Sequence, residues 1–386
     1  MRKLVIIAAG ITALAFTLFV VTVYALFGGS GAPFPDLRTP PTLAADQLKM
    51  VAELPQPPGN IAVSSSGRIF FTYHPESHAQ LKVLELVDGQ PVPYPSAEIQ
   101  SPKGETPSFD TVFSVRISSG GSTERLWTLD HGFHGIRRPR LLAFDIATRK
   151  VVFDLLFSRD VAGLGSFLQD MQISPDGKTV YISDTGVLNR EPSLILVDVA
   201  TKRVRRLLVG HPVLQPEPFT INARGKPMVL LGGLFWMHPG FDPIVLDRSG
   251  EWLYVGPMSG RSLYRIRTAD LLNDQLSAAT LATRVERYAD KPQSDGLTIA
   301  DDGTIYLTGI EHGAIFTIDP QRKLATLIEN PRLRWPDGMS FGPKGDVYVT
   351  DSALGEVMLK SQSAIAAAAP FHIWRFSSGK TARAGQ

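Results

Sequence analysis

The chain has 386 residues, with 39 basic and 37 acidic side chains and no cysteine. This balance of charge, without a basic run interleaved with aromatic residues, gives no reason to expect a nucleic-acid partner. The lack of cysteine excludes disulfides, a thiol nucleophile and metal sites built on thiolates. The 34 glycines and 29 prolines are spread along the chain, which suits many short strands joined by tight turns.

The first segment is strongly apolar. Arg2 and Lys3 precede an uncharged run from Leu4 to Phe27, and about 20 such residues suffice to cross a bilayer as a helix. The same run has the form of a long secretory signal, with Val23-Tyr24-Ala25 as its cleavage site. We interpret residues 1–27 as a signal peptide or a membrane anchor. Both interpretations place the rest of the chain outside the cytoplasm, either secreted or anchored.

Three further regions follow this segment. Residues 28–47 are rich in proline and glycine, which predicts an extended tether. Residues 48–378 form the predicted folded domain, and the apolar alternation of Leu48–Leu54 predicts its first strand. Residues 379–386 are predicted to be a disordered tail.

A short pattern recurs six times through the predicted domain. Each unit has an apolar strand, a polar turn ending in glycine, and a second strand rich in aromatic or β-branched residues. The turn glycines are Gly67, Gly121, Gly177, Gly250, Gly303 and Gly345. A period of roughly 55 residues with hairpin chemistry in each unit is typical of propeller blades. We therefore predict an all-β fold, a six-bladed β-propeller with four-stranded blades.

A helical pattern is nearly absent from the domain. Thr268–Tyr288 is the exception, and we predict a helical insertion there. Without alternating helices, a parallel α/β sheet is disfavoured.

Acidic residues precede the inner strand in five of the six units. They stand seven to eleven residues before the turn glycine, and Asn60 holds this position in the first unit. The acids are Asp110, Asp170, Asp242, Asp295 and Asp337. Because the inner strands of a propeller run along its axis, we expect these side chains to converge at one mouth of a central channel.

Such a ring of like charges is unfavourable by itself. A divalent cation (Ca²⁺, Mg²⁺, Mn²⁺ or Zn²⁺) or a cationic ligand would relieve the repulsion. Aspartate before glycine also begins turns through its own hydrogen bonds. Turn capping therefore stays an alternative for each of these acids.

Three other side chains are ligand-binding candidates near the mouth, namely His238, His312 and Trp335. Each has a structural alternative, as a buried histidine, a hairpin residue and a core aromatic. For His131 and His134 we expect a packing role within a loop, since Gly132 between them argues against a helix that would align them.

Several segments, in order, resemble the yellow / major royal jelly protein family. They are Arg125–Asp130, Arg138–Asp145, Ser166–Asp170, Val180–Gly186 and Leu253–Met258. The likeness runs from about Gly59 to Phe376. The second half is also similar to the wider senescence-marker protein / gluconolactonase propellers, through Ser294–Leu297 and Trp335–Met339.

These resemblances imply a six-bladed propeller with a site at the channel. The gluconolactonase-like enzymes hold one divalent metal with a Glu, an Asn and an Asp. The likeness places the Asp on Asp295 and the Asn on Asp242, whereas Gly59-Asn60 stands where the Glu is expected. The chain departs from the lactonase pattern there. The yellow family is functionally mixed, so the resemblance indicates fold more than activity.

Three functions remain open on the sequence. The first is a small-molecule site, with a metal-assisted hydrolase or isomerase of lactone-like or quinone-like substrates as its enzymatic form. Asp242 and Asp295 would then hold the metal, and Asp170 or Asp337 would act as base or orient the substrate. The second is a non-catalytic protein that binds small cationic or aromatic ligands. The third is a structural protein whose aspartates only cap turns. We expect a monomer that meets the membrane only through its N-terminal segment.

Overall fold

The structure is a computed structural model that describes residues 2–120 and 123–385. Six four-stranded antiparallel sheets form the blades of a propeller. Each innermost strand contacts the innermost strand of the next blade, and the last contacts the first, so the ring is closed. This confirms the six-bladed β-propeller. Of the six turn glycines, Gly121 lies outside the described residues.

In the first three blades the innermost strands are β3, β7 and β11. The first blade consists of β3 (Pro58–Val63), β4 (Ile69–Tyr73), β5 (Val83–Val87) and β6 (Gln90–Pro93). The second consists of β7 (Val112–Gly120), β8 (Thr123–Asp130), β9 (Arg140–Asp145) and β10 (Val151–Leu156). The third consists of β11 (Leu168–Ile173), β12 (Thr179–Asp184), β13 (Ser193–Asp198) and β14 (Val204–Leu207).

In the last three blades the innermost strands are β20, β24 and β28. The fourth blade consists of β20 (Phe241–Leu246), β21 (Trp252–Pro257), β22 (Ser262–Arg267) and β23 (Glu286–Asp290). The fifth consists of β24 (Leu297–Ile299), β25 (Ile305–Gly309), β26 (Ala314–Ile318) and β27 (Leu324–Glu329). The sixth consists of β28 (Pro336–Phe341), β29 (Asp346–Asp351), β30 (Phe371–Ser377) and β2 (Lys49–Leu54).

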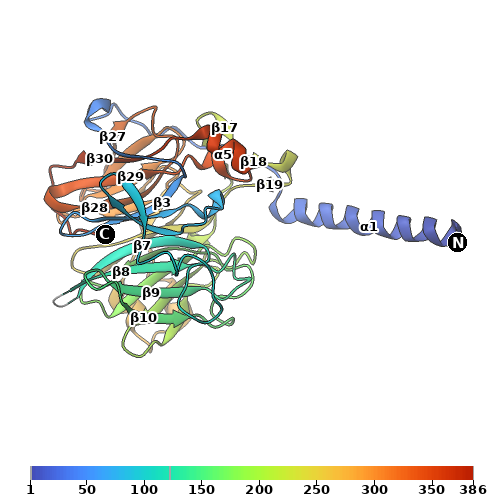
Figure 1. Ribbon diagram of the computed structural model, residues 1–386, viewed down its shortest axis with the longest axis horizontal. Coiled ribbons are helices and arrows are strands. Elements are labelled where there is room, and N and C mark those ends of the chain that lie inside the picture. The colour runs from blue at the N-terminus through green and yellow to red at the C-terminus, as the bar shows by residue number, and fades with distance from the viewer. Residues whose placement is uncertain (1, 121–122, 386) are drawn as a thin grey trace.

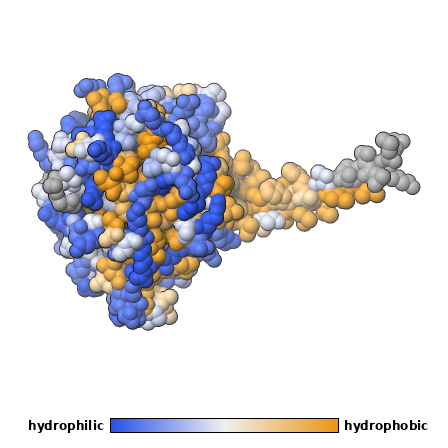
Figure 2. Space-filling model, turned by 60° about the horizontal axis from the view of Figure 1, so that its bottom comes forward, coloured by the Kyte–Doolittle hydropathy of each residue, from blue (hydrophilic) through white to orange (hydrophobic). Residues whose placement is uncertain are grey.

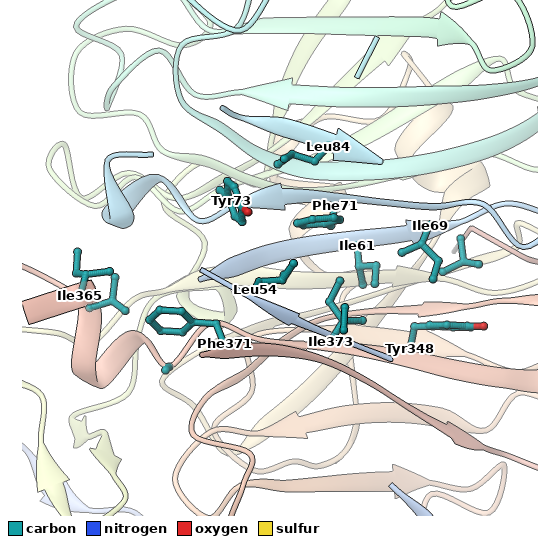
Figure 3. Close-up of a cluster of buried hydrophobic side chains, with 14 residues drawn as sticks. Leu54, Ile61, Ile69, Phe71, Tyr73, Leu84, Tyr348, Ile365, Phe371 and Ile373 are labelled. Carbon is teal, nitrogen blue, oxygen red and sulfur yellow. The ribbon is translucent and has the colours of Figure 1, made fainter. Parts of the chain in front are cut away.

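The sixth blade closes the ring with strands from distant parts of the chain. β2 pairs antiparallel with β30, from Lys49 opposite Arg375 to Leu54 opposite Phe371. This confirms the predicted strand at Leu48–Leu54 and makes it the outermost strand of the last blade. Apolar side chains of this blade pack against the first blade in one buried cluster (Figure 3). The labelled members Leu54, Ile61 and Ile373 come from β2, β3 and β30.

Short elements interrupt the connections between strands. Between β22 and β23 lie α2 (Thr268–Leu272) and α3 (Ala278–Ala282), so the predicted helical insertion ends earlier than Tyr288, which belongs to β23. The long connection from β14 to β20 carries η3 (Pro212–Leu214), η4 (Leu231–Gly233) and five short strands, of which four form two pairs and the fifth pairs with a strand outside the connection. These strands are β15 (Phe219–Thr220), β16 (Asn222–Ala223), β17 (Lys226–Pro227), β18 (Val229–Leu230) and β19 (Phe235–Trp236). The remaining elements are η1 (Ala45–Gln47), η2 (Pro75–Ser77), η5 (Pro343–Gly345), α4 (Leu354–Val357) and α5 (Gln362–Ala368).

The N-terminal helix α1 (Arg2–Phe27) projects from the body of the molecule as an apolar rod (Figures 1 and 2). By length and composition its Gly10–Phe27 part can cross a membrane, and a signal sequence has the same properties. Residues 28–47, predicted as a tether, lie against the propeller. β1 (Ala32–Pro33) pairs parallel with β15, and the Leu43 amide donates to the Leu327 carbonyl at 2.7 Å.

The propeller has two distinct ends. We call the end at which the innermost strands begin the mouth face. At the opposite end lie residues 379–385, which were predicted as part of a disordered tail. The Ile117 amide of β7 donates to the Gly385 carbonyl at 3.0 Å, and the Gly385 amide donates to the Phe341 carbonyl of β28 at 2.9 Å. Arg383 lies beside Leu246 and Ile299. The tail thus covers the end of the axis away from the mouth face.

Candidate functional site

Irregular pairing at the start of the inner strands places polar side chains at the axis. The ladder between the first two strands of a blade shifts register between Leu168 and Met171, and between Phe241 and Ile244. Matching shifts occur in the first and sixth blades. Such bulges bend a strand and redirect a side chain. Asn60, Asp170, Asp242 and Asp337 all stand inside these bulges, and Asp295 stands two residues before β24.

Four of the predicted acids meet at the mouth face, and we call them the axial carboxylates: Asp170, Asp242, Asp295 and Asp337. All four are buried, with Asp295 and Asp337 each 8% exposed. Burial raises the pKa of Asp295 to about 7, and the charge of Asp170 adds to this shift. Burial and the charge of Asp295 also raise the pKa values of Asp242 and Asp337 well above the usual range. Ionisation of all four would therefore place more negative charge here than the surroundings stabilise.

One guanidinium, missed from the sequence, neutralises part of this charge. Arg116 of β7 is fully buried, and its Nη2 donates to Asp170 Oδ2 at 2.9 Å. Its Nη1 donates to Asn60 Oδ1. Ser114 Oγ also donates to Asp170 Oδ1, at 2.8 Å. A signal existed, because an arginine inside an apolar inner strand is rarely buried without a partner.

The other axial carboxylates have fewer partners. Trp335 Nε1 donates to Asp295 Oδ2 at 2.6 Å, so this buried tryptophan positions an acid. Asp337 Oδ2 is buried without a hydrogen-bond partner among the residues that the structure describes. His74 Nε2 lies 3.9 Å from that oxygen. Burial lowers the pKa of His74 to about 3, so its ring is neutral and does not compensate the carboxylate.

Two glycines allow the inner strands to approach each other at the axis. A Cβ on Gly296 would lie 2.1 Å from the Asp337 carbonyl oxygen, and one on Gly338 would lie 2.7 Å from the Asn60 Cα. The Asp-Gly pairs at 295–296 and 337–338 therefore serve close packing between blades. For Asp295 the side chain bonds Trp335 across the blades, not its own turn.

Turn capping is performed by a different set of aspartates, at the ends of the second strands. Asp130 accepts from the Thr111 and Gly132 amides, and Asp184 accepts from the Phe167 and Gly186 amides. Asp351 does the same for Arg334 and Trp335. The aspartates of the blades therefore fall into two groups, those at the axis and those that cap turns.

Asp110 requires a correction. It lies before β7, where its carboxylate pairs with exposed Arg137, and no axial carboxylate shows an interaction with it. Phe113 stands at the ladder irregularity of this blade. The larger offset of Asp110 from the turn glycine, eleven residues against seven or eight, was the sign that it was out of register.

Phe113 belongs to a group of rings at the mouth face that we call the aromatic cluster: His74, Phe113, His131, His134 and Phe167. The Phe113 ring lies 5.1 Å from His74 and 4.9 Å from Phe167. His134 stacks on Phe167 at 4.7 Å. Burial lowers the pKa values of both His131 and His134, which agrees with the expected packing role. These rings come from the first three blades, whereas Asp242, Asp295 and Asp337 come from the last three.

Two predicted ligand-binding histidines lie away from the axial carboxylates. His238 stacks on Trp236 at 3.8 Å and lines a cavity of about 100 Å³ beside the end of α1. His312 Nε2 lies 3.8 Å from Asp36 Oδ1 in the segment after α1. Sequence proximity to the inner strands did not bring either ring to the axis.

A buried lysine, also missed, lies near Asp242. Lys291 is fully buried, and its Nζ donates to the Pro292 carbonyl at 2.9 Å. Burial lowers its pKa to about 7, while the charges of Glu217 and Asp242 oppose that shift. At neutral pH it supplies only part of a positive charge to the site.

The residues do not fit the metal site that gluconolactonase-like propellers imply. Asn60 Oδ1 and Asp170 are already bonded to Arg116. Within residues 2–120 and 123–385, no three acidic or histidine side chains lie close enough to hold a metal ion. The oxygen donors have suitable chemistry for a hard cation, but their arrangement is too open.

Comparisons with known proteins settle the family. The family model for major royal jelly protein matches residues 111–367. The chain belongs to the major royal jelly protein family. Major royal jelly protein 6 of Apis mellifera is 24% identical over 203 residues, which are 50% of this chain and 44% of that relative. The match thus spans less than half of the relative's length.

Solved structures share the fold of this family member at low identity. A luciferin-regenerating enzyme aligns with a TM-score of 0.56 and 10% identity, covering 88% of this chain and 98% of its own. Regucalcin of Agrobacterium tumefaciens, a calcium-binding protein, aligns with a TM-score of 0.54 and 15% identity, over 87% and 98%. A gluconolactonase of Xanthomonas campestris aligns with a TM-score of 0.53 and 11% identity, over 91% and 98%.

Proposed function

We propose that the mouth face binds a small organic cation, an amine that carries an aromatic or apolar group. The observation that carries this proposal is that carboxylates and aromatic rings lie at the same mouth, each group on one half of the propeller. The carboxylates that Arg116 does not pair, Asp242, Asp295 and Asp337, come from the fourth to sixth blades. The aromatic cluster comes from the first three blades. A ligand with a charged amine and a ring matches both halves.

The charge balance supports a cation. Against four axial carboxylates stand the guanidinium of Arg116 and the buried Lys291. Asp242 accepts no hydrogen bond that the described residues show, and Asp337 has a free buried oxygen. An ammonium group placed between them would supply donors and remove mutual repulsion.

The aromatic side supports an organic ligand. Phe113 is 9% exposed and Phe167 is partly exposed, so both rings can contact a molecule at the mouth. A cation near an aromatic face gains about 0.5–2 kcal/mol, more when water is excluded. Binding sites for small molecules commonly combine such apolar walls with a few placed polar groups.

The alternative is a metal-assisted hydrolase, as in the gluconolactonase whose fold this chain shares. Asp242 and Asp295 would be the metal ligands and Asp337 the base. The engagement of Asn60 and Asp170 by Arg116 favours the amine over this alternative. The relationship to major royal jelly protein 6 covers half of this chain and supports the family more than any activity.

Isothermal titration with 2-phenylethylamine tests the proposal, with 2-phenylethanol as the uncharged analogue. We expect micromolar binding of the amine and none of the alcohol. Asp295→Asn should weaken the affinity by at least about tenfold, the effect of 1.4 kcal/mol. Asp176→Asn is the matched control, because that exposed aspartate lies in a turn at the opposite end, bonded to Ser174.

Each other outcome contradicts the proposal in a distinguishable way. Stoichiometric Ca²⁺, Mn²⁺ or Zn²⁺ in the purified protein, lost on Asp242→Asn with Asp295→Asn, supports the hydrolase, and lactone turnover then follows as its assay. Equal binding of the amine and the alcohol shows an aromatic site without a role for the carboxylates. If neither probe binds and the purified protein holds no metal, the axial carboxylates have only a structural role.

A further inference from the structure

We propose that the mouth face rests on the surface of the lipid bilayer that α1 crosses. The axial carboxylates would then open toward the membrane surface, not toward bulk solvent. This inference concerns the placement of the site and stands whether its ligand is an amine or a metal. It rests on the exit point of α1 and on the exposed side chains around it.

The connection between α1 and the propeller is very short. The helical part that can span a membrane ends at Phe27, and the Gly29 amide already donates to the Gly233 carbonyl at 3.2 Å. The Ala32 amide donates to the Pro218 carbonyl at 3.0 Å. Two residues of extended chain span about 7 Å. The loops that receive this segment must therefore lie close to the bilayer boundary.

These receiving loops belong to the mouth face. Leu26 and Phe27 line one cavity with Val187, from the loop after β12, and with Trp236 of β19. β12 ends opposite the start of β11, where Asp170 lies. The connection that contains β19 leads directly into β20, where Asp242 lies. α1 thus leaves the same end of the propeller that carries the axial carboxylates (Figure 1).

Exposed apolar side chains gather on the loops of this face. They are Phe133, Ile136, Leu164, Leu188, Val209, Leu231 and Leu359. Leu164 is 70% exposed. The loops that carry Leu188, Leu164 and Phe133 are neighbours, because the Leu188 amide donates to Gly165, and the Gly165 amide donates to His134. An apolar surface therefore continues from the end of α1 across the third and second blades.

The rest of the described propeller surface differs. Except for the adjacent pair Val151 and Val152, its exposed large apolar residues lie singly on outer strands and their turns, or on α2 near the opposite end: Met50, Val87, Val92, Val151, Val152 and Leu272. Single exposed apolar residues need no partner, whereas grouped ones indicate a contact surface. A bilayer suits this surface because loops with large apolar residues insert into the interface between headgroups and acyl chains.

Site-directed spin labelling of the full chain tests this placement, and the lack of native cysteine makes single labels clean. Leu164→Cys and Leu188→Cys report on the mouth face. Leu272→Cys is the matched control, since Leu272 is 49% exposed and Leu188 is 43% exposed. Each variant is placed in phosphatidylcholine nanodiscs with one chain per disc, which prevents contacts between copies. Collision with oxygen is then compared with collision with a polar nickel chelate.

We expect the labels at 164 and 188 to favour oxygen over the nickel chelate several-fold more than the label at 272. This difference in oxygen preference between the mouth-face labels and the label at 272 should vanish when α1 is held in a detergent micelle that is too small to reach the loops. Equal accessibility of all three labels in nanodiscs overturns the proposal. Recovery of the chain from cells without residues 1–25, in the soluble fraction, also overturns it, because no helix then holds this face at a bilayer.

Discussion

At the residue scale, the site contains fewer positive charges than carboxylates, so each positive side chain matters. Arg116 is bonded to both Asn60 and Asp170, and its guanidinium is fully buried. A buried charge pair adds little stability compared with an apolar replacement of both partners, but removal of one partner leaves an uncompensated charge. Arg116 therefore fixes two side chains of the mouth, and its charge opposes the rise in the pKa of Asp170 that burial causes.

Replacement of Arg116 should show the cost of leaving Asp170 buried without its partner. Arg116→Met is expected to lower the free energy of unfolding by about 3–5 kcal/mol, and Asp170→Asn in the same chain should restore part of the loss. Chemical denaturation measures both effects. Arg203→Met is the control, because Arg203 is 60% exposed and its pair with Asp274 contributes little. Equal losses for the two arginine variants would show that the buried pair has no special role.

The raised pKa values of the axial carboxylates predict how stability depends on pH. Asp295 has a folded pKa of about 7 against an ordinary value of 3.8. Its contribution to the free energy of unfolding is therefore complete below pH 3.8 and is lost as pH rises through 7. His74 works in the opposite direction below pH 6.5, because its folded pKa is lowered to about 3. Between pH 6.5 and 8 the carboxylates dominate, and the ligand-free protein should become less stable.

Asp295→Asn should remove part of this slope. The amide keeps an oxygen for Trp335 Nε1 but carries no charge. We expect a gain of at least about 1 kcal/mol at pH 8, the free energy of one pKa unit, and a smaller gain at pH 5, which lies between the unfolded and the folded pKa of Asp295. Thermal unfolding at both pH values checks this. A variant that is less stable than the parent at pH 8 would show that the ionised carboxylate is favoured where it stands.

At the scale of elements, the bulges and glycines at the start of the inner strands shape the mouth. Gly296 packs against the Asp337 carbonyl, and a side chain there would force two blades apart. Gly256 of β21 is a milder case, since an added Cβ would meet the Lys291 Cε and the Ser262 carbonyl oxygen no closer than 3.2 Å. Neither glycine has a positive φ. The difference between them is therefore packing alone.

Gly296→Ala and Gly256→Ala make a matched pair of variants. We expect Gly296→Ala to lower the free energy of unfolding by about 3 kcal/mol, through overpacking against backbone. Gly256→Ala should cost less than about 1 kcal/mol, since contacts at 3.2 Å need shifts of only a few tenths of an ångström and alanine suits a strand better than glycine. Urea unfolding of both variants provides the comparison. Similar small losses would show that the axis is loosely packed.

The sequence predicted the blades and the positions of Asp170, Asp242, Asp295 and Asp337, because strand alternation and turn glycines repeat regularly. It did not predict which side chains oppose them. Arg116 of the second blade reaches Asp170 of the third, and that geometry depends on how neighbouring blades pack. Asp110 was misplaced, since counting from a turn cannot detect a loop that is longer by a few residues. Local sequence also does not show that residues 379–385 lie across the axis.

At the scale of the whole molecule, the C-terminal residues cover the end of the propeller away from the mouth face, so the proposed ligand site has one accessible end. Gly385 bonds to β7 and β28 at the end away from the mouth face. Ligand entry and exit would then share one route. This arrangement follows from the tail and not from the blades, so the tail can be removed to test it.

A chain that ends at Ser378 should show faster exchange at the uncovered end. The Ile117 amide loses its acceptor, the Gly385 carbonyl, so its hydrogen exchange should rise by at least about tenfold. Association and dissociation of 2-phenylethylamine should both become faster, with the equilibrium affinity unchanged. Exchange followed by mass spectrometry and stopped-flow binding measure these effects. An unchanged exchange rate at Ile117 would show that the tail does not protect the axis.

The pairing of β2 with β30 has a consequence for biosynthesis. The two strands of this pair are separated by more than 300 residues. At about 5–20 residues per second, a ribosome needs roughly 15–60 s to make the intervening chain. During that time β2 has been made while its partner has not been translated, and its edge is open to aggregation and proteases. The ring therefore cannot close until β30 is made, and premature release of the nascent chain leaves the sixth blade incomplete.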